Sequence, residues 1–246
     1  MPNGTGERLL DGDLKFLQNF QPIGGFDGIP LVNIEAAILP LTGVLPTIAQ
    51  HVKEIKHSNL TDKTGSGLTV DEIVAIRLYT EESSSNDPNL YRLLNHELRS
   101  ENRVEFPKWH LFLKLIINGL NKLPSTEGLI YRGVKFDCSA YTNQTVVTWA
   151  GFSSCSTSLN VIESFLGNQG VGALFTIKSK FGKKIAQFSA FNEEEVILLP
   201  GTQLKINSKA TRNEGFAIIE LEEIGSPLLS NVKSSKLIAQ TAVSLK

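Results

Sequence analysis

Asn192-Glu193-Glu194-Glu195-Val196-Ile197-Leu198-Leu199-Pro200-Gly201 carries three consecutive carboxylates directly into a run of apolar residues. An apolar, partly β-branched run that ends at Pro-Gly predicts a buried strand, so the carboxylates lie at its beginning. A carboxylate at the rim of a cleft has a pKa that its surroundings can tune, which suits it to catalysis. An acidic surface turn before a strand is the alternative, and this stretch alone leaves it open.

The residues on both sides of this stretch predict a β-rich C-terminal half. Short runs rich in β-branched and aromatic residues recur there, separated by Gly, Asn and Ser. The runs lie at 129–134, 145–149, 173–177, 196–199, 203–206 and 216–221. One helical pattern, at 161–166, lies among them. The basic residues within 178–184 are expected on the solvent face of a strand and its turn.

The preceding part of the chain has the pattern of helices. Apolar residues recur there at helical spacing, first at Ile34, Ala37, Ile38 and Leu41. Thr69 and Glu72 form the sequence pattern of a capping box, which predicts the start of a helix. Phe106-Pro107 indicates the start of another helix, whose apolar face continues to Leu120.

A run of helices followed by a run of strands is typical of the α+β class rather than of alternating α/β folds. The 246 residues, 41% of them hydrophobic, can bury the core of one large domain. We therefore expect a single domain over 1–246. It divides into a helical subdomain near 30–123, a β-rich core near 124–225 and a C-terminal tail at 226–246.

Composition and charge exclude several classes of function. The net charge is −1 and no dense Lys/Arg run occurs, so we expect no binding to nucleic acid. No segment has the apolar length of a signal peptide or a membrane span, which predicts a soluble protein and leaves its compartment open. The four histidines lack the spacing of a metal site, and no metal is expected. Cys138 and Cys155 are too few for a disulfide framework, and whether they pair stays open.

Two further polar motifs are candidates for a functional site. Arg132 ends a predicted strand and is followed by Gly133, which lets a ligand approach the backbone. An arginine in a cleft requires an anion, usually a phosphate, while a salt bridge is the alternative. Ser154 and Ser156 stand two apart, so both hydroxyls can line one face of a strand. The alternative for the serines is capping of the helix that follows.

Three motifs in this chain order resemble the Arg-Ser-Glu class of mono-ADP-ribosyltransferases, and most closely its arginine-specific eukaryotic ecto-type branch. They are Tyr131-Arg132-Gly133, Phe152-Ser153-Ser154-Cys155-Ser156 and Glu193-Glu194-Glu195. The likeness covers roughly residues 30–225 and includes Leu98-Arg99-Ser100-Glu101-Asn102-Arg103 in the helical part. It implies a mixed, mainly antiparallel β-sandwich with an NAD cleft. It also implies an enzyme that transfers ADP-ribose from NAD to an arginine of a target protein.

The resemblance implies a role for each motif residue. Arg132 would bind the pyrophosphate and ribose side of NAD, and the Gly133 backbone would hold the nicotinamide amide. Ser154 would orient the nicotinamide ribose and the catalytic carboxylate of Glu195. Ser156 gives a second possible alignment of the motif serine and would also contact NAD. We favour Ser154, because an aromatic residue stands two positions before it.

The chemistry explains why two carboxylates are useful. Cleavage of the nicotinamide–ribose bond passes through an oxocarbenium-like transition state, which Glu195 can stabilise. A guanidinium acceptor is protonated at neutral pH, so a second carboxylate must attract it and take its proton. The resemblance gives that role to Glu193. Phe191 is a hypothetical platform for the guanidinium, with a place in the core as its alternative.

Two other functions remain open. An NAD glycohydrolase, with water as the acceptor, shares the first half of the reaction. A non-catalytic NAD-binding or interaction module would use the helical part to contact a partner. The motif residues Arg132, Ser154, Glu193 and Glu195 are all present and argue against this module, because a site without catalysis has no need of so many polar groups.

Overall fold

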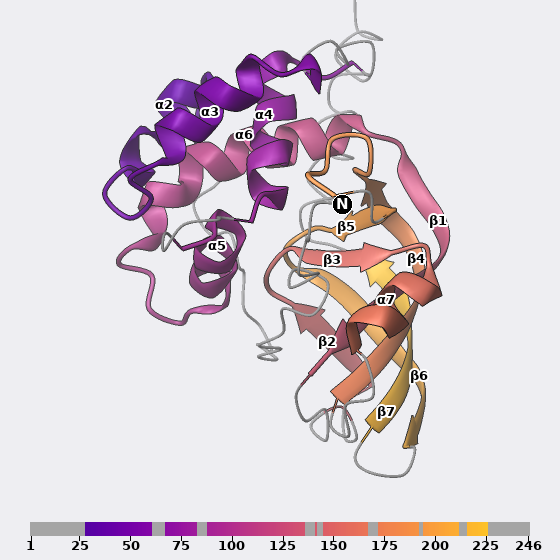
Figure 1. The fold of residues 1–246 in the computed structure, drawn as a ribbon. Coiled ribbons are helices and arrows are strands. Elements are labelled where there is room, and N and C mark those ends of the chain that lie inside the picture. The colour runs from indigo at the N-terminus through magenta and orange to yellow at the C-terminus, as the bar shows by residue number, and fades with distance from the viewer. Residues whose placement is uncertain are drawn as a thin grey trace, which may run out of the picture.

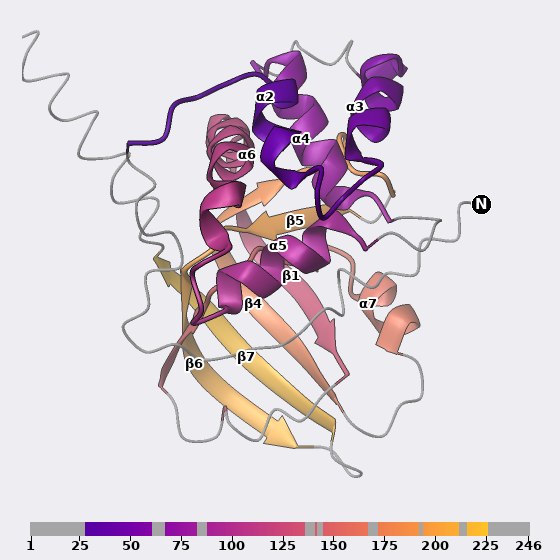
Figure 2. The same cartoon turned by 90° about the vertical axis from the view of Figure 1, so that its left-hand side faces the viewer.

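The computed structural model describes residues 28–60, 67–82, 88–135, 141, 145–166, 172–191, 194–211 and 216–225. In these ranges a layer of helices lies against one end of a twisted β-sheet, as Figure 1 and Figure 2 show from two directions. The helices of this layer precede the strands in the chain, so the predicted α+β class is confirmed. None of the helices in these ranges has the length and hydrophobicity needed to cross a membrane.

The helical layer is organised around one central helix. Its elements are α2 (Ile34–Ile38), η1 (Leu39–Leu41), α3 (Ile48–Lys56), α4 (Val70–Thr80), α5 (Leu90–Arg99), η3 (Phe106–Trp109) and α6 (His110–Lys122). The capping box at Thr69 is confirmed: its amide donates to Glu72 Oε2 at 2.8 Å, and its Oγ1 accepts from the Glu72 amide at 3.3 Å. Helix α4 contacts α3 and α6, and it is buried on almost every side.

The strands form one continuous sheet in the described part of the chain. They are β1 (Ser125–Val134), β2 (Val146–Trp149), β3 (Ser153–Ser156), β4 (Gly172–Lys184), β5 (Glu195–Leu198), β6 (Thr202–Thr211) and β7 (Phe216–Gly225), with α7 (Leu159–Leu166) between β3 and β4. Their order is β1-β3-β5-β4-β7-β6-β2, and β1 also pairs with β4. The β4–β7 pair is parallel and the other pairs are antiparallel. Strands β1, β3, β5 and β4 therefore close on one another, and the sandwich arises from one sheet that folds over.

Strand β5 is buried on both faces, which explains its uninterrupted apolar sequence. Ile197 belongs to the hydrophobic cluster that also contains the core of the helical layer. Val196 and Leu198 belong to a second cluster inside the sheet, together with Trp149 and Phe175. Since side chains alternate along a strand, one face of β5 looks toward the helices and the other looks into the folded sheet.

The structure extends several elements beyond the predicted bounds. Strand β4 continues through the basic residues to Lys184, and Lys183 is buried rather than on a solvent face. Lys183 Nζ donates to the Leu123 carbonyl at 2.8 Å and to Ser125 Oγ at 3.3 Å, and burial lowers the pKa of this lysine. Lys178 and Lys184 are exposed as expected. Lys183 departs from the expectation because it pairs with the start of β1, which only the tertiary fold reveals.

Candidate active site

The register of β3 against β5 brings Ser156 and Glu195 together. Ser156 is the direct partner of Glu195, and Ser154 is the direct partner of Ile197. Partners in an antiparallel pair project from the same face, so both serines and Glu195 share the face that looks toward the helices. Glu195 and Ser156 have no exposed surface, and Ser154 is 1% exposed. The structure therefore places these polar side chains at a buried junction of the two layers.

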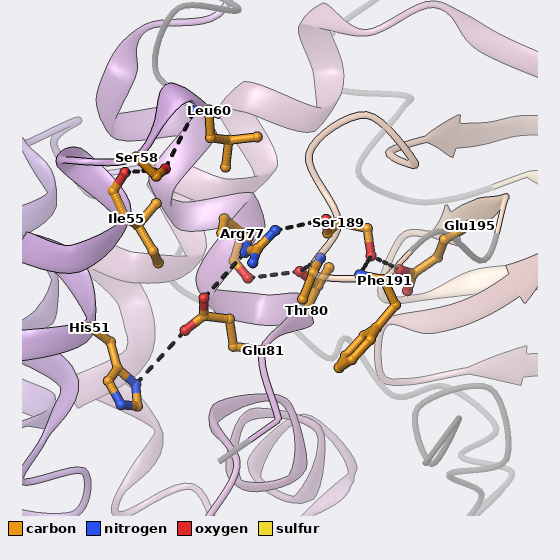
Figure 3. A network of polar contacts seen from close by, with 11 residues as sticks. His51, Ile55, Ser58, Leu60, Arg77, Thr80, Glu81, Ser189, Phe191 and Glu195 are labelled. Carbon is orange, nitrogen blue, oxygen red and sulfur yellow. Dashed lines mark hydrogen bonds and ion pairs between the residues drawn. The ribbon is translucent and has the colours of Figure 1, made fainter. Parts of the chain in front are cut away.

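Ser189 is a donor to the Glu195 carboxylate. It lies in the loop between β4 and β5, and its Oγ donates to Glu195 Oε2 at 2.8 Å (Figure 3). The Glu195 backbone is held as well, because its carbonyl accepts from the Ile185 amide at 2.9 Å. Hydrogen bonds to an ionised carboxylate are among the stronger ones in proteins. The carboxylate is therefore fixed in position by the loop that precedes it.

The same loop is attached to the helical layer. Arg77 Nη1, on α4, donates to the Ser189 carbonyl at 2.9 Å, and Thr80 Oγ1 accepts from the Ala190 amide at 2.9 Å (Figure 3). The Phe191 amide donates to Ser189 Oγ at 3.4 Å, and the Phe191 side chain is half-buried. Two consecutive residues of the loop are thus held by the last turn of α4.

Glu194 makes a sharp turn immediately before the candidate catalytic residue. Its φ is +47°, the left-handed region that residues other than glycine rarely adopt. Two contacts hold it there: Thr157 Oγ1 donates to Glu194 Oε2 at 2.5 Å, and the Thr157 amide donates to the Glu194 carbonyl at 3.3 Å. The turn at Glu194 directs the backbone into β5, whose first residue is Glu195. Glu193, the predicted acceptor-binding carboxylate, lies outside the described residues.

The Arg132 side chain projects from the face of β1 opposite to the one that carries Tyr131. Its neighbour Tyr131 is the partner of Ser156, and Arg132 itself projects with Ile130 and Val134 toward the cluster inside the sheet. It is 1% exposed, and its Nη1 donates to the Ser154 carbonyl at 2.5 Å. The guanidinium carbon also lies 6.0 Å from the centroid of the Trp149 ring. The structure therefore brings Arg132 against the backbone of β3, on the face of β1 opposite to Tyr131.

Ser154 and Ser156 differ in their local contacts. The Ser156 Oγ accepts from the Ser158 amide at 3.1 Å, as a residue near the start of a helix often does. The Ser154 Oγ is buried and has no hydrogen-bond partner among the described residues. Buried hydroxyls are normally satisfied, so this one is available to a ligand. Gly133, the remaining motif residue, is paired with Leu174 across β1 and β4.

Cys155 separates the two serines and takes no part in nucleophilic chemistry. It is a free thiol that is fully buried, and burial raises its pKa to about 12. A thiol in that state is not a nucleophile near neutral pH. Cys138 lies outside the described residues. Within the described ranges, no three or more His, Cys, Asp or Glu side chains form a group that could hold a metal ion.

The sequence analysis assigned no role to Ser189, Arg77 or Thr80. Ser189 stands six residues before Glu195 in Phe188-Ser189-Ala190, where no spacing rule marks it. Arg77 and Thr80 lie on a helix more than a hundred residues earlier, in a stretch whose apolar pattern indicates only a core helix. The contacts between α4 and the loop depend on the packing of the two layers, which no local pattern encodes.

The chain matches known proteins along most of its described length. A family model described as NAD:arginine ADP-ribosyltransferase matches residues 44–227. T-cell ecto-ADP-ribosyltransferase 2 of Mus musculus is 31% identical over 126 residues, which is 50% of this chain and 42% of the relative. The erythroblast NAD(P)(+)--arginine ADP-ribosyltransferase of Gallus gallus is 25% identical over 179 residues, covering 69% of this chain and 56% of the relative. The chain thus spans about half the length of these curated relatives.

Solved structures share the fold. ADP-ribosyltransferase HopU1 of Pseudomonas syringae superposes with a TM-score of 0.58 at 20% identity, covering 72% of this chain and 87% of that protein. The eukaryotic mono-ADP-ribosyltransferase ART2.2 superposes with a TM-score of 0.54 at 21% identity, covering 79% of this chain and 84% of that protein. At these identities the likeness concerns the fold alone.

Proposed function

The chain belongs to the NAD:arginine ADP-ribosyltransferase family, and we propose that it transfers ADP-ribose from NAD to an arginine side chain of a target protein, with release of nicotinamide. One observation carries this proposal. Glu195 is a wholly buried carboxylate that lies opposite Ser156 and accepts a hydrogen bond from Ser189. A carboxylate held in this way can stabilise positive charge on a ribose without first having to reorganise.

In the proposed reaction, the bond between nicotinamide and C1′ of the ribose breaks. Nicotinamide leaves as a neutral molecule with the electron pair of that bond, and the ribose carbon becomes oxocarbenium-like. Glu195 stabilises this charge as the carboxylates of glycosidases do. A nitrogen of the acceptor guanidine then attacks C1′ and loses a proton.

We assign the motif serine to Ser156. It is the direct strand partner of Glu195, whereas Ser154 is two pairs further along the ladder. The backbone and side chain of Ser154 are useful in a different way. Its carbonyl accepts a hydrogen bond from Arg132 Nη1, and its buried hydroxyl is available to NAD. NAD binding would thus involve both serines, with Ser156 nearer the catalytic carboxylate.

Arg132 serves the site through the backbone of β3 in this proposal. Its donation to the Ser154 carbonyl fixes the strand that carries both serines. A buried guanidinium also contributes positive charge beneath the strand, which favours a phosphate-bearing ligand. Gly133 follows it on β1, and its backbone is the proposed contact for the nicotinamide amide. No metal ion is required by this chemistry.

The acceptor side of the site is assigned to Glu193 and Phe191. Glu193 stands two residues before Glu195, and its carboxylate would attract the acceptor guanidinium and take its proton. The half-buried ring of Phe191 follows the anchored Ser189 and Ala190, so it is presented at a defined place in the loop. A flat guanidinium stacks well on such a ring.

The proposal is tested by incubation with NAD, with and without agmatine as a small guanidino acceptor. Nicotinamide, ADP-ribose and ADP-ribosyl-agmatine are separated by chromatography, and Glu195→Gln serves as the matched inactive control. An acceptor-dependent adduct is the expected result. Nicotinamide and free ADP-ribose without adduct would show an NAD glycohydrolase instead. Absence of turnover, with NAD binding retained, would show a binding module.

A further inference from the structure

Arg77 joins the helical layer to the loop that carries Ser189. Its Nη1 donates to the Ser189 carbonyl at 2.9 Å, and its Nε donates to Glu81 Oε1 at 3.2 Å, one turn further along the chain. Glu81 in turn lies 3.9 Å from His51 Nδ1 on α3. The guanidinium therefore binds Glu81 on its own helical side and the Ser189 carbonyl of the loop on the other, as Figure 3 shows.

Ser189 is held at its backbone and acts through its side chain. Its amide donates to the Ile185 carbonyl at 3.0 Å, and its carbonyl accepts from Arg77. The next amide, of Ala190, donates to Thr80, whose hydroxyl donates to the Arg77 carbonyl at 2.8 Å. With its peptide groups fixed in this way, Ser189 places its hydroxyl within reach of Glu195, and Oγ donates to Glu195 Oε2 at 2.8 Å.

The Arg77 side chain is not enclosed by packing. It lines a cavity of about 440 Å³ together with Glu54, Ile55, Ser58, Asn59, Leu60 and Glu81. Figure 3 shows the side chains of Ile55, Ser58 and Leu60 on this side of the guanidinium, away from Ser189. Two polar contacts hold the guanidinium of this partly exposed side chain, and a shorter side chain can be accommodated there without overpacking.

We propose that Arg77 is a positioning residue for Glu195 and acts on it through Ser189. The inference rests on the proposed function, because it takes Glu195 as the catalytic carboxylate. Arg77 contacts Glu81 and the Ser189 backbone rather than the Glu195 carboxylate. It sets the place of the Ser189 peptide, and the Ser189 hydroxyl sets the place of the carboxylate. Catalysis depends on such placement, since an error near 1 Å at a reacting group lowers the rate about 100-fold.

The test compares Arg77→Met with Lys56→Met as a matched control. Both residues are cations in the helical layer with side chains 29% exposed, and each has two polar contacts. Lys56 pairs with Glu35 on α2 and Asp71 on α4, both within the helical layer. Initial rates of agmatine ADP-ribosylation are measured against NAD concentration. Ser189→Ala, Ser189→Thr and the Arg77→Met/Ser189→Ala double variant complete the series, and melting temperatures check folding.

The expected result has three parts. Arg77→Met and Ser189→Ala each lower kcat by about 10- to 100-fold, while the KM for NAD changes less than about 2-fold and Lys56→Met is unaffected. The double variant is no slower than the slower single variant, because both act through one hydroxyl. Ser189→Thr, which keeps the hydroxyl, recovers most of the rate. Losses that multiply in the double variant, or equal rates for Arg77→Met and Lys56→Met, would overturn the proposal.

A measurement without turnover separates this inference from the proposed function. Amide hydrogen exchange is recorded for Ser189 and Ala190 in the wild-type protein, Arg77→Met and Lys56→Met. Faster exchange at Ala190 in Arg77→Met alone is expected, since the loop loses an anchor. If the wild-type protein neither transfers ADP-ribose nor hydrolyses NAD, the proposed function fails. Faster exchange at Ala190 in Arg77→Met would still support the positioning of the Ser189 loop by Arg77. Unchanged exchange at Ala190 in Arg77→Met would refute this positioning role, whether or not the protein is active on NAD.

Discussion

Ser156 and Glu195 are direct partners in the antiparallel ladder between β3 and β5, and neither has exposed surface. The two residues lie 39 positions apart in the chain. Their pairing places a hydroxyl and a carboxylate side by side on the face that looks toward the helical layer.

Substitution of the buried carboxylate is expected to remove all chemistry. Glu195→Gln keeps the size of the side chain but loses the charge that stabilises the ribose cation. Both agmatine transfer and NAD hydrolysis should fall by at least about 100- to 1,000-fold. Chromatographic assay of nicotinamide release measures both. Glu220→Gln, at an exposed position of β7, serves as the control. Hydrolysis that survives in Glu195→Gln at the wild-type rate would contradict the assignment.

The two glutamates of the acidic stretch are expected to divide the reaction. Glu193→Gln should lose agmatine transfer, because the acceptor guanidinium has no carboxylate to receive its proton. Cleavage of NAD with water should persist at a measurable rate, since Glu195 is intact. The ratio of ADP-ribosyl-agmatine to free ADP-ribose reports the division. Normal transfer in Glu193→Gln would show that another group accepts the proton.

The two serines are expected to differ in kind. Ser156→Ala should lower kcat by about 10- to 100-fold through loss of a hydroxyl beside Glu195. Ser154→Ala should mainly raise the KM for NAD, because its hydroxyl has no partner among the described residues and is available to the ligand. Removal of an unsatisfied buried hydroxyl should also leave the unfolding free energy unchanged or raise it by about 1 kcal/mol. The opposite pattern in kcat would restore Ser154 as the motif serine.

Arg132 is expected to contribute to stability. Arg132→Ala removes the donor to the Ser154 carbonyl and leaves a cavity under β3. The unfolding free energy should drop by about 2–5 kcal/mol, as for other large-to-small changes in a core. Urea unfolding at pH 7 measures the change. An unaltered unfolding midpoint, with only a weaker affinity for NAD, would mean that the guanidinium serves the ligand alone.

Glu72 is expected to make the fold sensitive to acid. Burial opposes its ionisation, but hydrogen bonds from Lys122, the Thr69 amide and Asn118 outweigh burial and lower its pKa. Since its pKa in the folded state lies below the unfolded value of about 4.3, the stabilisation is complete above that pH and is lost as the pH falls through the folded pKa. Glu72→Gln should cost about 1–3 kcal/mol at pH 7.

The check for Glu72 is urea unfolding at pH 7 and at pH 3. The difference between the wild-type protein and Glu72→Gln should shrink at the lower pH, because pH 3 lies below the unfolded pKa and the stabilisation from ionised Glu72 decreases there. Glu127→Gln, at an exposed position of β1, is the control and should differ from the wild-type protein by less than about 0.5 kcal/mol at either pH. A constant difference for Glu72→Gln would show that its ionisation does not contribute.

Local sequence patterns predicted much of the fold because they depend on residues that are close together in the chain. The capping box at Thr69 and Glu72 formed as expected, since both partners lie within one turn. The runs at 129–134 and 216–221 became β1 and β7. Strand β3 is different. Its residues, Ser153-Ser154-Cys155-Ser156, have a weak strand pattern, and only pairing with β1 and β5 makes it a strand.

The sequence by itself determined the class of fold, the family and the identity of Glu195 as a carboxylate that begins an apolar strand. Those properties depend on residue type and spacing along the chain. The tertiary structure alone decided which serine faces Glu195, on which face of β1 Arg132 lies, and that Arg77 holds the Ser189 loop. These depend on strand register and on the packing of two layers. A shift of register by one residue would turn every side chain to the other face.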